Sequence, residues 1–187
     1  MSSTTDFTAH FLIAMPGMRD PRFQHTVTYI CEHNENGAMG IVVNRLLDMR
    51  LGDLLSHMDI EAPESLISDA PIHQGGPVQT ERGFVLHRPA QAWDSTLRIT
   101  DEIAVTTSRD ILEAIAHGDG PDDRLVALGY AGWGPGQLEQ EFLDNAWLSG
   151  PADNAILFEV PVDQRWQSAA GRLGIDIARL HGDAGHA

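Results

Sequence analysis

The amino-acid sequence predicts an α+β protein in which helices pack on a mixed β-sheet. Short apolar runs rich in β-branched residues recur between turn signals, as is typical of strands. In other segments apolar residues repeat at i, i+3, i+4 and i+7, which is the spacing of an amphipathic helix. One pair of strands is joined by a short turn and is therefore antiparallel, whereas helices separate several others, so a mixed sheet is expected.

The first third of the chain contains the clearest hairpin. An apolar strand is expected at residues 10–15 and ends at Pro16-Gly17. The next strands are expected at residues 26–32 and 38–44. The turn signal Asn34-Glu35-Asn36-Gly37 lies between them, and its length predicts an antiparallel hairpin.

The rest of the chain alternates between short strands and helices. Residues 59–70 are acidic and interrupted by prolines, which predicts a surface connection, and Gly75-Gly76-Pro77 predicts a sharp turn. A helix is expected to open with a capping box at residues 107–110 and to end at Gly118. Further strands are expected at residues 83–87, 96–99, 103–106, 125–128 and 155–160, and further helices at residues 51–58, 138–147 and 163–173, the last one capped by Asp163. The total is seven to nine strands and four helices.

The predicted elements fit one domain that spans residues 1–187, with an ordered core at about 7–174 and a loose tail at 175–187. No apolar run approaches the ~20 residues that a membrane-spanning helix needs. The apolar segment at residues 11–15 is too short for a secretion signal, and no basic segment precedes it. A cytoplasmic protein without a membrane association is therefore expected.

The charge excludes several classes of function. The formal net charge is −15, which disfavours binding to the phosphates of nucleic acids and to anionic membrane surfaces. All 12 cationic residues are arginines. Without a lysine, Schiff-base chemistry and a Walker-type nucleotide site are excluded.

The segment at residues 129–136 contains four glycines around Trp133, between an expected strand and an expected helix. Such a layout presents backbone N–H groups to an anion. However, the glycine spacing is not that of a dinucleotide-binding loop, and Glu139 and Glu141 at the start of the helix would repel a phosphate. We therefore expect a strand-to-helix joint with Trp133 packed into the fold, and only secondarily the wall of a site.

Cys31 and His33 are a candidate reactive pair. Side chains two residues apart on a strand point to the same face, where an imidazole favours the thiolate form of a cysteine. The alternative is a buried, inert cysteine. Cys31 is the one cysteine of the chain, so an internal disulfide is excluded.

Two other sets of residues have the chemistry of a site but not its spacing. His33, His73 and His87 would provide three zinc ligands only if folding brought them together; hydrogen-bonded structural histidines are the alternative. The pairs Asp101-Glu102 and Asp122-Asp123 have the carboxylates that a hydrolase uses, but neighbours in a turn do not face one substrate. We predict no metal, no cofactor and no catalytic residue.

Several long segments resemble the AlgH/YqgE family, in the family's order. They are residues 11–18, 20–23, 29–34, 37–45, 75–78, 82–87 and 128–139, so that the resemblance covers residues of about 10 to 174. One departure is Leu46, which stands where a proline is frequent in the family.

The resemblance implies a largely antiparallel, branched mixed sheet with a small barrel-like portion and helices packed around it. Members of the family are labelled as transcriptional regulators, a label derived from a proposed role in alginate production. No catalytic residue is established for the family, so the resemblance assigns none here.

Together these observations favour a non-enzymatic regulatory or binding module that acts through a protein partner or a small ligand. The alternative is an enzyme or small-ligand binder with a pocket where the Cys31-Glu32-His33 strand end meets the glycine segment at 132–136. Its candidate binding residues are Cys31, His33, Asn44, Arg45, Trp133 and Gln137. A regulator that binds DNA directly is disfavoured by the net charge and by the absence of a basic run.

Overall fold

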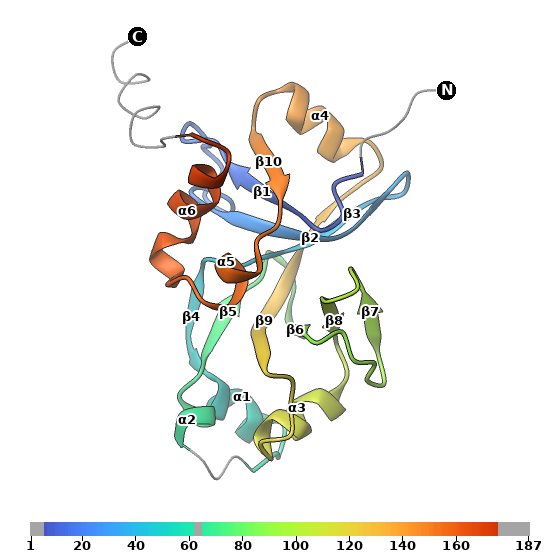
Figure 1. Cartoon of the computed structure of the whole chain (residues 1–187), viewed down its shortest axis with the longest axis vertical. Coiled ribbons are helices and arrows are strands. Elements are labelled where there is room, and N and C mark those ends of the chain that lie inside the picture. Colours follow the sequence, from blue (N-terminus) through green and yellow to red (C-terminus); the bar gives the residue numbers. More distant parts are fainter. Residues whose placement is uncertain (1–5, 62–64, 176–187) are drawn as a thin grey trace.

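The structure is a computed structural model that describes residues 6–61 and 65–175 of the chain (Figure 1). The strands are β1 (His10–Ala14), β2 (Val27–Asn34), β3 (Gly37–Val42), β4 (Leu46–Arg50), β5 (Pro71–Gln74), β6 (Val78–Arg88), β7 (Thr96–Arg98), β8 (Ala104–Thr106), β9 (Asp123–Trp133) and β10 (Trp147–Pro151). The helices are α1 (Leu51–His57), α2 (Ser65–Ser68), α3 (Arg109–Ala116), α4 (Gln137–Leu143), α5 (Asn154–Phe158) and α6 (Arg165–Arg172), with a 3-10 turn η1 (Val162–Gln164) before α6. The loose tail expected at residues 175–187 lies, beyond Ile175, outside the described residues.

Within the described residues, ten strands form one curled, half-barrel sheet in the order β10-β1-β2-β3-β9-β6-β8-β7, with β5 and β4 branching from β9. The pairings are antiparallel except that of β5 with β9, in which His73 lies beside Ala127. The expected α+β class, the hairpin of β2 and β3 and the branched sheet are thus confirmed.

The sheet branches along β9, which is the long central strand in Figure 1. Along one edge β9 pairs with β6, and along the other it pairs first with β5 and then, from Ala131 onward, with β3. The glycine-rich segment expected to be a turn is therefore strand as far as Trp133, and only residues 134–136 form the joint to α4. In the turn between β5 and β6, which crosses β9 at the branch, position 76 must be glycine, because a Cβ there would lie 2.1 Å from the carbonyl carbon of Tyr130.

Three apolar clusters stabilise the sheet. Helices α5 and α6 cover one cluster through residues such as Ile156 and Ala169, and α1 and α3 cover a second one around Leu55 and Ile111. The third cluster lies beneath α4 and includes Leu138. Consecutive residues of β9 alternate between the first two clusters, as expected for a strand buried on both faces. Figure 1 shows α4 near one end of β9 and the helices α1 to α3 near its other end.

The expected strand at residues 155–160 is wrong, because α5 begins there. The Asp153 side chain accepts a hydrogen bond from the Ala155 N–H at 2.9 Å and so caps the helix. An apolar run as short as residues 155–158 does not distinguish a strand from a helix by periodicity.

The helix expected at residues 138–147 ends instead at Leu143. Asn145 adopts a left-handed conformation with φ +60°, and this ends the helical path. The chain then enters β10, whose Trp147 pairs with Ala14 of β1. The strand partner, which is distant in sequence, therefore overrides the local helical pattern.

Three further elements, α2, β4 and β5, were missed, and two caps differ. The expected surface connection at residues 59–70 contains α2, in which Ile67 is buried. Residues 62–64 of this connection lie outside the described part. Strand β4, which comes directly before α1, was not expected. The capping box expected at residues 107–110 does not form, because the Asp110 carboxylate accepts hydrogen bonds from the Ser108 hydroxyl and the Ile111 N–H and does not reach back to the N–H at the start of the box. Asp163 lies within η1, so Gln164 is the residue that precedes α6.

Candidate functional site

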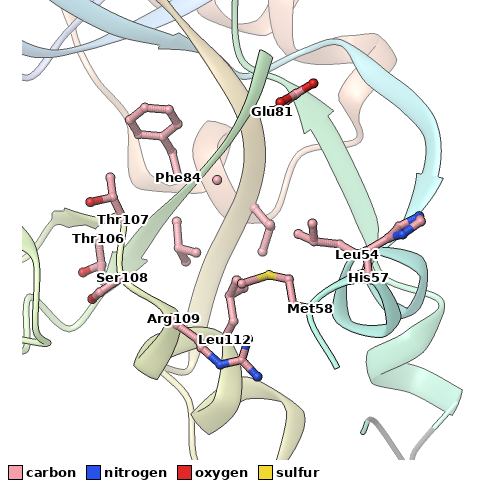
Figure 2. A pocket seen from close by; sticks show the side chains of 13 residues that line it. Leu54, His57, Met58, Glu81, Phe84, Thr106, Thr107, Ser108, Arg109 and Leu112 are labelled. Carbon is pink, nitrogen blue, oxygen red and sulfur yellow. The ribbon is translucent and has the colours of Figure 1, made fainter. Parts of the chain in front are cut away.

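The strongest candidate site is a pocket of about 300 Å³ between α1, the middle of β6 and the start of α3 (Figure 2). Its lining comprises Leu54, His57, Met58, Glu81, Gly83, Phe84, Val85, Thr106, Thr107, Ser108, Arg109, Leu112 and Val126. Small-molecule pockets in proteins begin at about this size and are mostly apolar with a few polar groups. The size and the lining therefore fit a small ligand.

The floor of the pocket is apolar because it is a gap in the second core cluster. The floor consists of side chains from β6, β9 and α3 that are buried in this cluster: Val85, Val126 and Leu112. From the opposite side α1 presents Leu54 and Met58, which lie one turn apart on the same helical face. The apolar body of a ligand would thus be enclosed by two helices and the sheet.

Strand β6 determines what faces the pocket. From Gly83 onward β6 pairs in regular register with β9, so Gly83 and Val85 share one face while Phe84 leaves from the other, and Phe84 and Glu81 also reach the lining of the pocket. The Arg82 guanidinium lies 5.5 Å from the Phe84 ring. At Gly83 an added Cβ would meet only Leu128 Cδ2, at 4.0 Å, so the pocket owes part of its space to a missing side chain.

The rim of the pocket has three ionisable side chains, His57, Glu81 and Arg109, all exposed. The Arg109 Nε donates to Oε1 of Glu113 at 2.8 Å, one turn along α3. Among the described residues Glu81 has neither a hydrogen-bond nor an ion-pair partner. The rim therefore combines one engaged cation with one carboxylate that is available to a ligand.

The hydroxyl groups at the start of α3 are already engaged. The Ser108 hydroxyl donates to Oδ1 of Asp110 at 2.6 Å and accepts from the Ser95 N–H at 3.0 Å. A serine nucleophile is activated by a base strong enough to take its proton, usually an imidazole, whereas the partner of Ser108 is an aspartate carboxylate that only accepts its hydrogen bond. Ser108 thus shapes the pocket by fixing the start of α3.

The structure separates Cys31 from His33. A β-bulge between Ile30 and Glu32 adds a residue to β2, so that the two side chains leave on different sides of the strand. Cys31 is buried in the first core cluster, and burial, aided by the nearby Glu32 carboxylate, raises the pKa of its thiol. The thiol faces apolar side chains and the Tyr29 carbonyl rather than an imidazole.

The His33 side chain lies beside α4, and each of its two ring nitrogens has a hydrogen-bond partner. Its Nδ1 accepts a hydrogen bond from the Phe7 N–H at 3.0 Å, so Nε2 carries the proton and donates to Oε1 of Glu139 at 2.5 Å. The ring also stacks on Phe7, with centroids 5.4 Å apart. His33 therefore fixes the N-terminal segment against α4.

Trp133 and Gln137 meet at the same helix. The indole N–H groups of Trp133 and Trp147 both donate to Oε1 of Glu141, at 3.0 and 2.9 Å. Gln137 accepts from the Gly134 N–H and donates to Oε2 of Glu141. The glutamates that would repel an anion are thus partners of side chains within the fold.

Asn44 and Arg45 lie at the opposite end of β3 from the hairpin turn. Asn44 accepts from the Val27 N–H at 2.8 Å, and Arg45 donates to the carbonyl oxygens of Pro21, Arg22 and Gln24. Both side chains thereby hold the loop between β1 and β2, and they are not brought together with the other four candidate residues.

The hairpin end does meet the glycine segment, because Ala38 of β3 pairs with Trp133 of β9. An open cleft of about 340 Å³ lies beside this contact, lined by Glu32, Asn34, Asn36, Gly37, Ala38, Met39 and Trp133. Of the six candidate residues, Trp133 is the one in its lining. The cleft is more polar and more open to solvent than the pocket beside β6.

The three histidines of the possible zinc site are held apart. His87 contacts Oγ1 of Thr106 at 2.7 Å, whereas His73 contacts the Val126 carbonyl at 3.2 Å and a guanidinium nitrogen of Arg165 at 3.1 Å. Throughout residues 6–61 and 65–175 no group of three histidine, cysteine or acidic side chains is placed to bind a metal ion.

At least one carboxylate of each acidic pair has a partner within the fold. Asp123 forms an ion pair with Arg88 at 2.6 Å, and Glu102 accepts from the Asn154 amide at 2.9 Å. Each pair therefore contributes to local structure at the surface.

The sequence interpretation missed the pocket beside β6. Its lining comes from three segments, at residues 54–58, 81–85 and 106–112, with Val126 added from β9. One signal was available: Gly83 stands directly before the apolar run at residues 84–86, and a glycine inside a strand marks a place where a ligand or a backbone approaches closely.

The branched, half-barrel sheet with its covering helices and the pocket beside β6 define an α+β protein with a ligand-sized cavity at its sheet. A family model described as AlgH-like matches residues 11–178, so the chain belongs to the AlgH-like family. The resemblance inferred from the sequence is confirmed.

Relatives match along the whole chain. A UPF0301 protein of Thioalkalivibrio sulfidiphilus is 62% identical over 187 residues, which is 100% of each chain, and one of Nitrosococcus oceani is 53% identical over the same length and coverage. The solution structure of the AlgH protein from Pseudomonas aeruginosa has a TM-score of 0.81 and 51% identity, covering 96% of this chain and 95% of that one.

A crystal structure of a protein from Corynebacterium diphtheriae has a TM-score of 0.74 at 20% identity, covering 97% of this chain and 94% of that one, and shares the fold. In the part of the chain that the structure describes, every helix is too short or too polar to cross a bilayer.

Proposed function

We propose that the protein is a non-enzymatic binding module whose regulatory action depends on a small ligand held in the pocket beside β6. The observation that carries the proposal is the apolar gap between α1, α3 and the sheet, which has the volume of a ligand pocket and a rim of polar groups. A partner protein would then respond to the occupied or the empty pocket. A cytoplasmic location is part of this proposal.

The side chains around the pocket support binding rather than catalysis. The Ser108 hydroxyl is hydrogen-bonded to Asp110 and, among the described residues, to no imidazole that would make it a nucleophile. The Arg109 guanidinium is paired with Glu113 and is therefore not a free cation. The formal charge of −15 also favours an action through a ligand or a protein partner over direct contact with DNA.

Gly83→Leu tests the proposal most directly. The Cβ at Gly83 would meet only Leu128 Cδ2 at 4.0 Å, so a leucine there extends into the cavity. An uncharged apolar fluorescent probe such as Nile red should bind the native protein and show at least roughly tenfold weaker binding to this variant, since it loses the buried apolar contact.

Gly171→Leu is the matched control, because a Cβ at Gly171 meets nothing within 4 Å and the residue lies on α6, outside the pocket. It should leave probe binding unchanged. If the native protein does not bind the probe, or if both variants bind it like the native protein, the pocket is not a ligand site.

The cleft at the hairpin end is a second candidate for an enzyme or a small-ligand binder. The specific observation in its favour is that the hairpin and the glycine segment meet through Ala38 and Trp133, as this alternative requires. A ligand in this cleft would change the fluorescence of Trp133, and the response would persist in Gly83→Leu. A ligand in the pocket beside β6 would lose its effect in that variant.

A further inference from the structure

We infer that the pocket beside β6 selects ligands with an apolar body and a single cationic head, such as an alkylammonium or alkylguanidinium group, and that Glu81 binds the head. This inference rests on the proposed function and adds the class of ligand. Three observations carry it: the position of Glu81, the engagement of Arg109 and the charge of the chain.

Glu81 is placed to bind a group that enters the pocket. It lies two residues before Gly83 on β6, and both residues line the same pocket. Figure 2 shows the Glu81 side chain at the opposite end of the pocket from Arg109 and Leu112. Within the described residues this carboxylate has no partner, so its acceptor positions are free for an ammonium group.

The neighbouring cation on β6 does not neutralise Glu81. The Arg82 guanidinium lies 5.5 Å from the Phe84 ring, and its Nη1 donates to Oε1 of Gln79 at 3.3 Å. Within the described residues no ion pair joins it to Glu81, although the two residues are adjacent in the sequence.

Arg109 offers less to an anionic ligand than its place on the rim suggests. Its Nε is held at 2.8 Å from Glu113, and both side chains are about half-exposed, at 48% and 49%. An anion would have to compete with that carboxylate and would also meet the unpaired charge of Glu81. His57 is the remaining ionisable side chain on the rim.

The charge of the whole chain acts in the same direction. With 27 acidic and 12 cationic side chains, the protein attracts cations and repels anions at low salt. The local and the global electrostatics therefore agree, and the apolar floor requires that the cation carry a hydrocarbon portion.

The test compares three probes that share a six-carbon chain: hexylammonium, hexanol and hexanoate. Binding is measured at pH 8 and low salt by ligand-observed NMR and by chemical-shift changes of the protein. Hexylammonium should bind roughly tenfold more tightly than hexanoate, with hexanol between them, because attraction to the carboxylate and repulsion by it act in opposite directions.

Glu81→Gln should weaken the binding of hexylammonium about fivefold and leave hexanol unchanged. Glu35→Gln, in the turn between β2 and β3, removes the same charge from a distant exposed position and should have little effect. Glu113→Gln frees Arg109 from its partner and should strengthen the binding of hexanoate.

The outcomes separate the two proposals. If the three probes bind equally well and Gly83→Leu abolishes their binding, the pocket is a ligand site without a preference for cations, and the inference about Glu81 is wrong. If Glu81→Gln and Glu35→Gln weaken hexylammonium equally, the charge of the chain rather than Glu81 is responsible. If no probe binds the native protein, the proposed function itself fails.

Discussion

Nη1 of Arg165 lies 3.1 Å from Nε2 of His73, and this contact determines the form of the histidine. A guanidinium nitrogen always donates, so Nε2 is the acceptor and the proton is on Nδ1, which lies 3.2 Å from the Val126 carbonyl oxygen. Both side chains are buried, at 4% and 7% exposure. Arg165 also donates from Nη1 to the Val43 carbonyl and from Nε to the Val160 carbonyl, so it connects α6 to β5 and to the end of β3.

The stability of the protein should decrease as the pH falls from about 6.5 to about 4. Burial and the adjacent Arg165 lower the pKa of His73 from its ordinary value of 6.5 to about 4. Between these two values the unfolded chain binds a proton at this histidine and the folded chain does not, so acid favours unfolding. His73 alone accounts for a loss on the order of 3 kcal/mol over this range. Urea denaturation at a series of pH values measures it.

His73→Gln provides the comparison. It should reduce the pH dependence of the free energy of unfolding between pH 4 and 6.5, and the slope that is left should come from groups such as His87, whose pKa is also lowered by burial. An unchanged slope in His73→Gln would contradict the assignment.

Arg165→Met should raise the pKa of His73 and destabilise the fold. The guanidinium is one of the two causes of the low pKa of His73, so its removal leaves only burial to lower it. The loss of its hydrogen bonds leaves buried carbonyl groups unpaired, at a cost of about 2 kcal/mol. The position of the His73 Cε1 proton signal against pH measures the first effect, and urea denaturation the second.

A control variant distinguishes a general loss of stability in Arg165→Met from the electrostatic coupling between Arg165 and His73. Arg172→Met removes an exposed arginine of the same helix that pairs with Asp153 at 2.9 Å, and it should move neither the His73 titration nor the stability by much. A lower stability of Arg165→Met with an unmoved His73 titration would mean that the two side chains are neighbours without electrostatic coupling.

The elements that the sequence predicted correctly are those that local signals define. The turn at Asn34–Gly37 specifies the hairpin of β2 and β3, and Gly118, with φ +81°, ends α3 as expected. The errors at β10 and α5 arose where a distant partner or a single cap decides between helix and strand. Trp147 pairs with β1 although the pattern before it is helical, and Asp153 starts a helix in a run that is also apolar enough for a strand.

The sites were harder to predict than the elements. Cys31 and His33 share a face on a regular strand, and only the bulge, which is a tertiary feature, separates them. The pocket beside β6 requires Met58, Glu81 and Leu112 to meet, and no local spacing encodes that meeting. The position of Gly83, directly before the apolar run of its strand, was the one trace of the pocket in the sequence.

Gly76→Ala should destabilise the protein by at least about 3 kcal/mol, because the branch of the sheet has no room for a side chain. An added Cβ would lie 2.1 Å from the carbonyl carbon of Tyr130 and 2.4 Å from the Ala131 nitrogen, and both are backbone atoms that cannot rotate away. Thermal and urea unfolding measure the loss. Gly17→Ala is the control, since a Cβ there meets nothing within 4 Å; it should change the stability by less than about 0.5 kcal/mol.

The Cys31 thiol should resist alkylation in the folded protein and react readily in urea. It is buried at 2% exposure, and burial raises the pKa of the thiol, so both access and the thiolate that reacts are lacking in the native state. Mass spectrometry after iodoacetamide treatment at pH 8, with and without urea, measures the modified fraction. His33→Ala should not change the rate in the native state by a direct effect on the thiol, since the bulge in β2 directs the imidazole to Glu139. Rapid native modification that slows in this variant would show instead that the two residues act as a reactive pair.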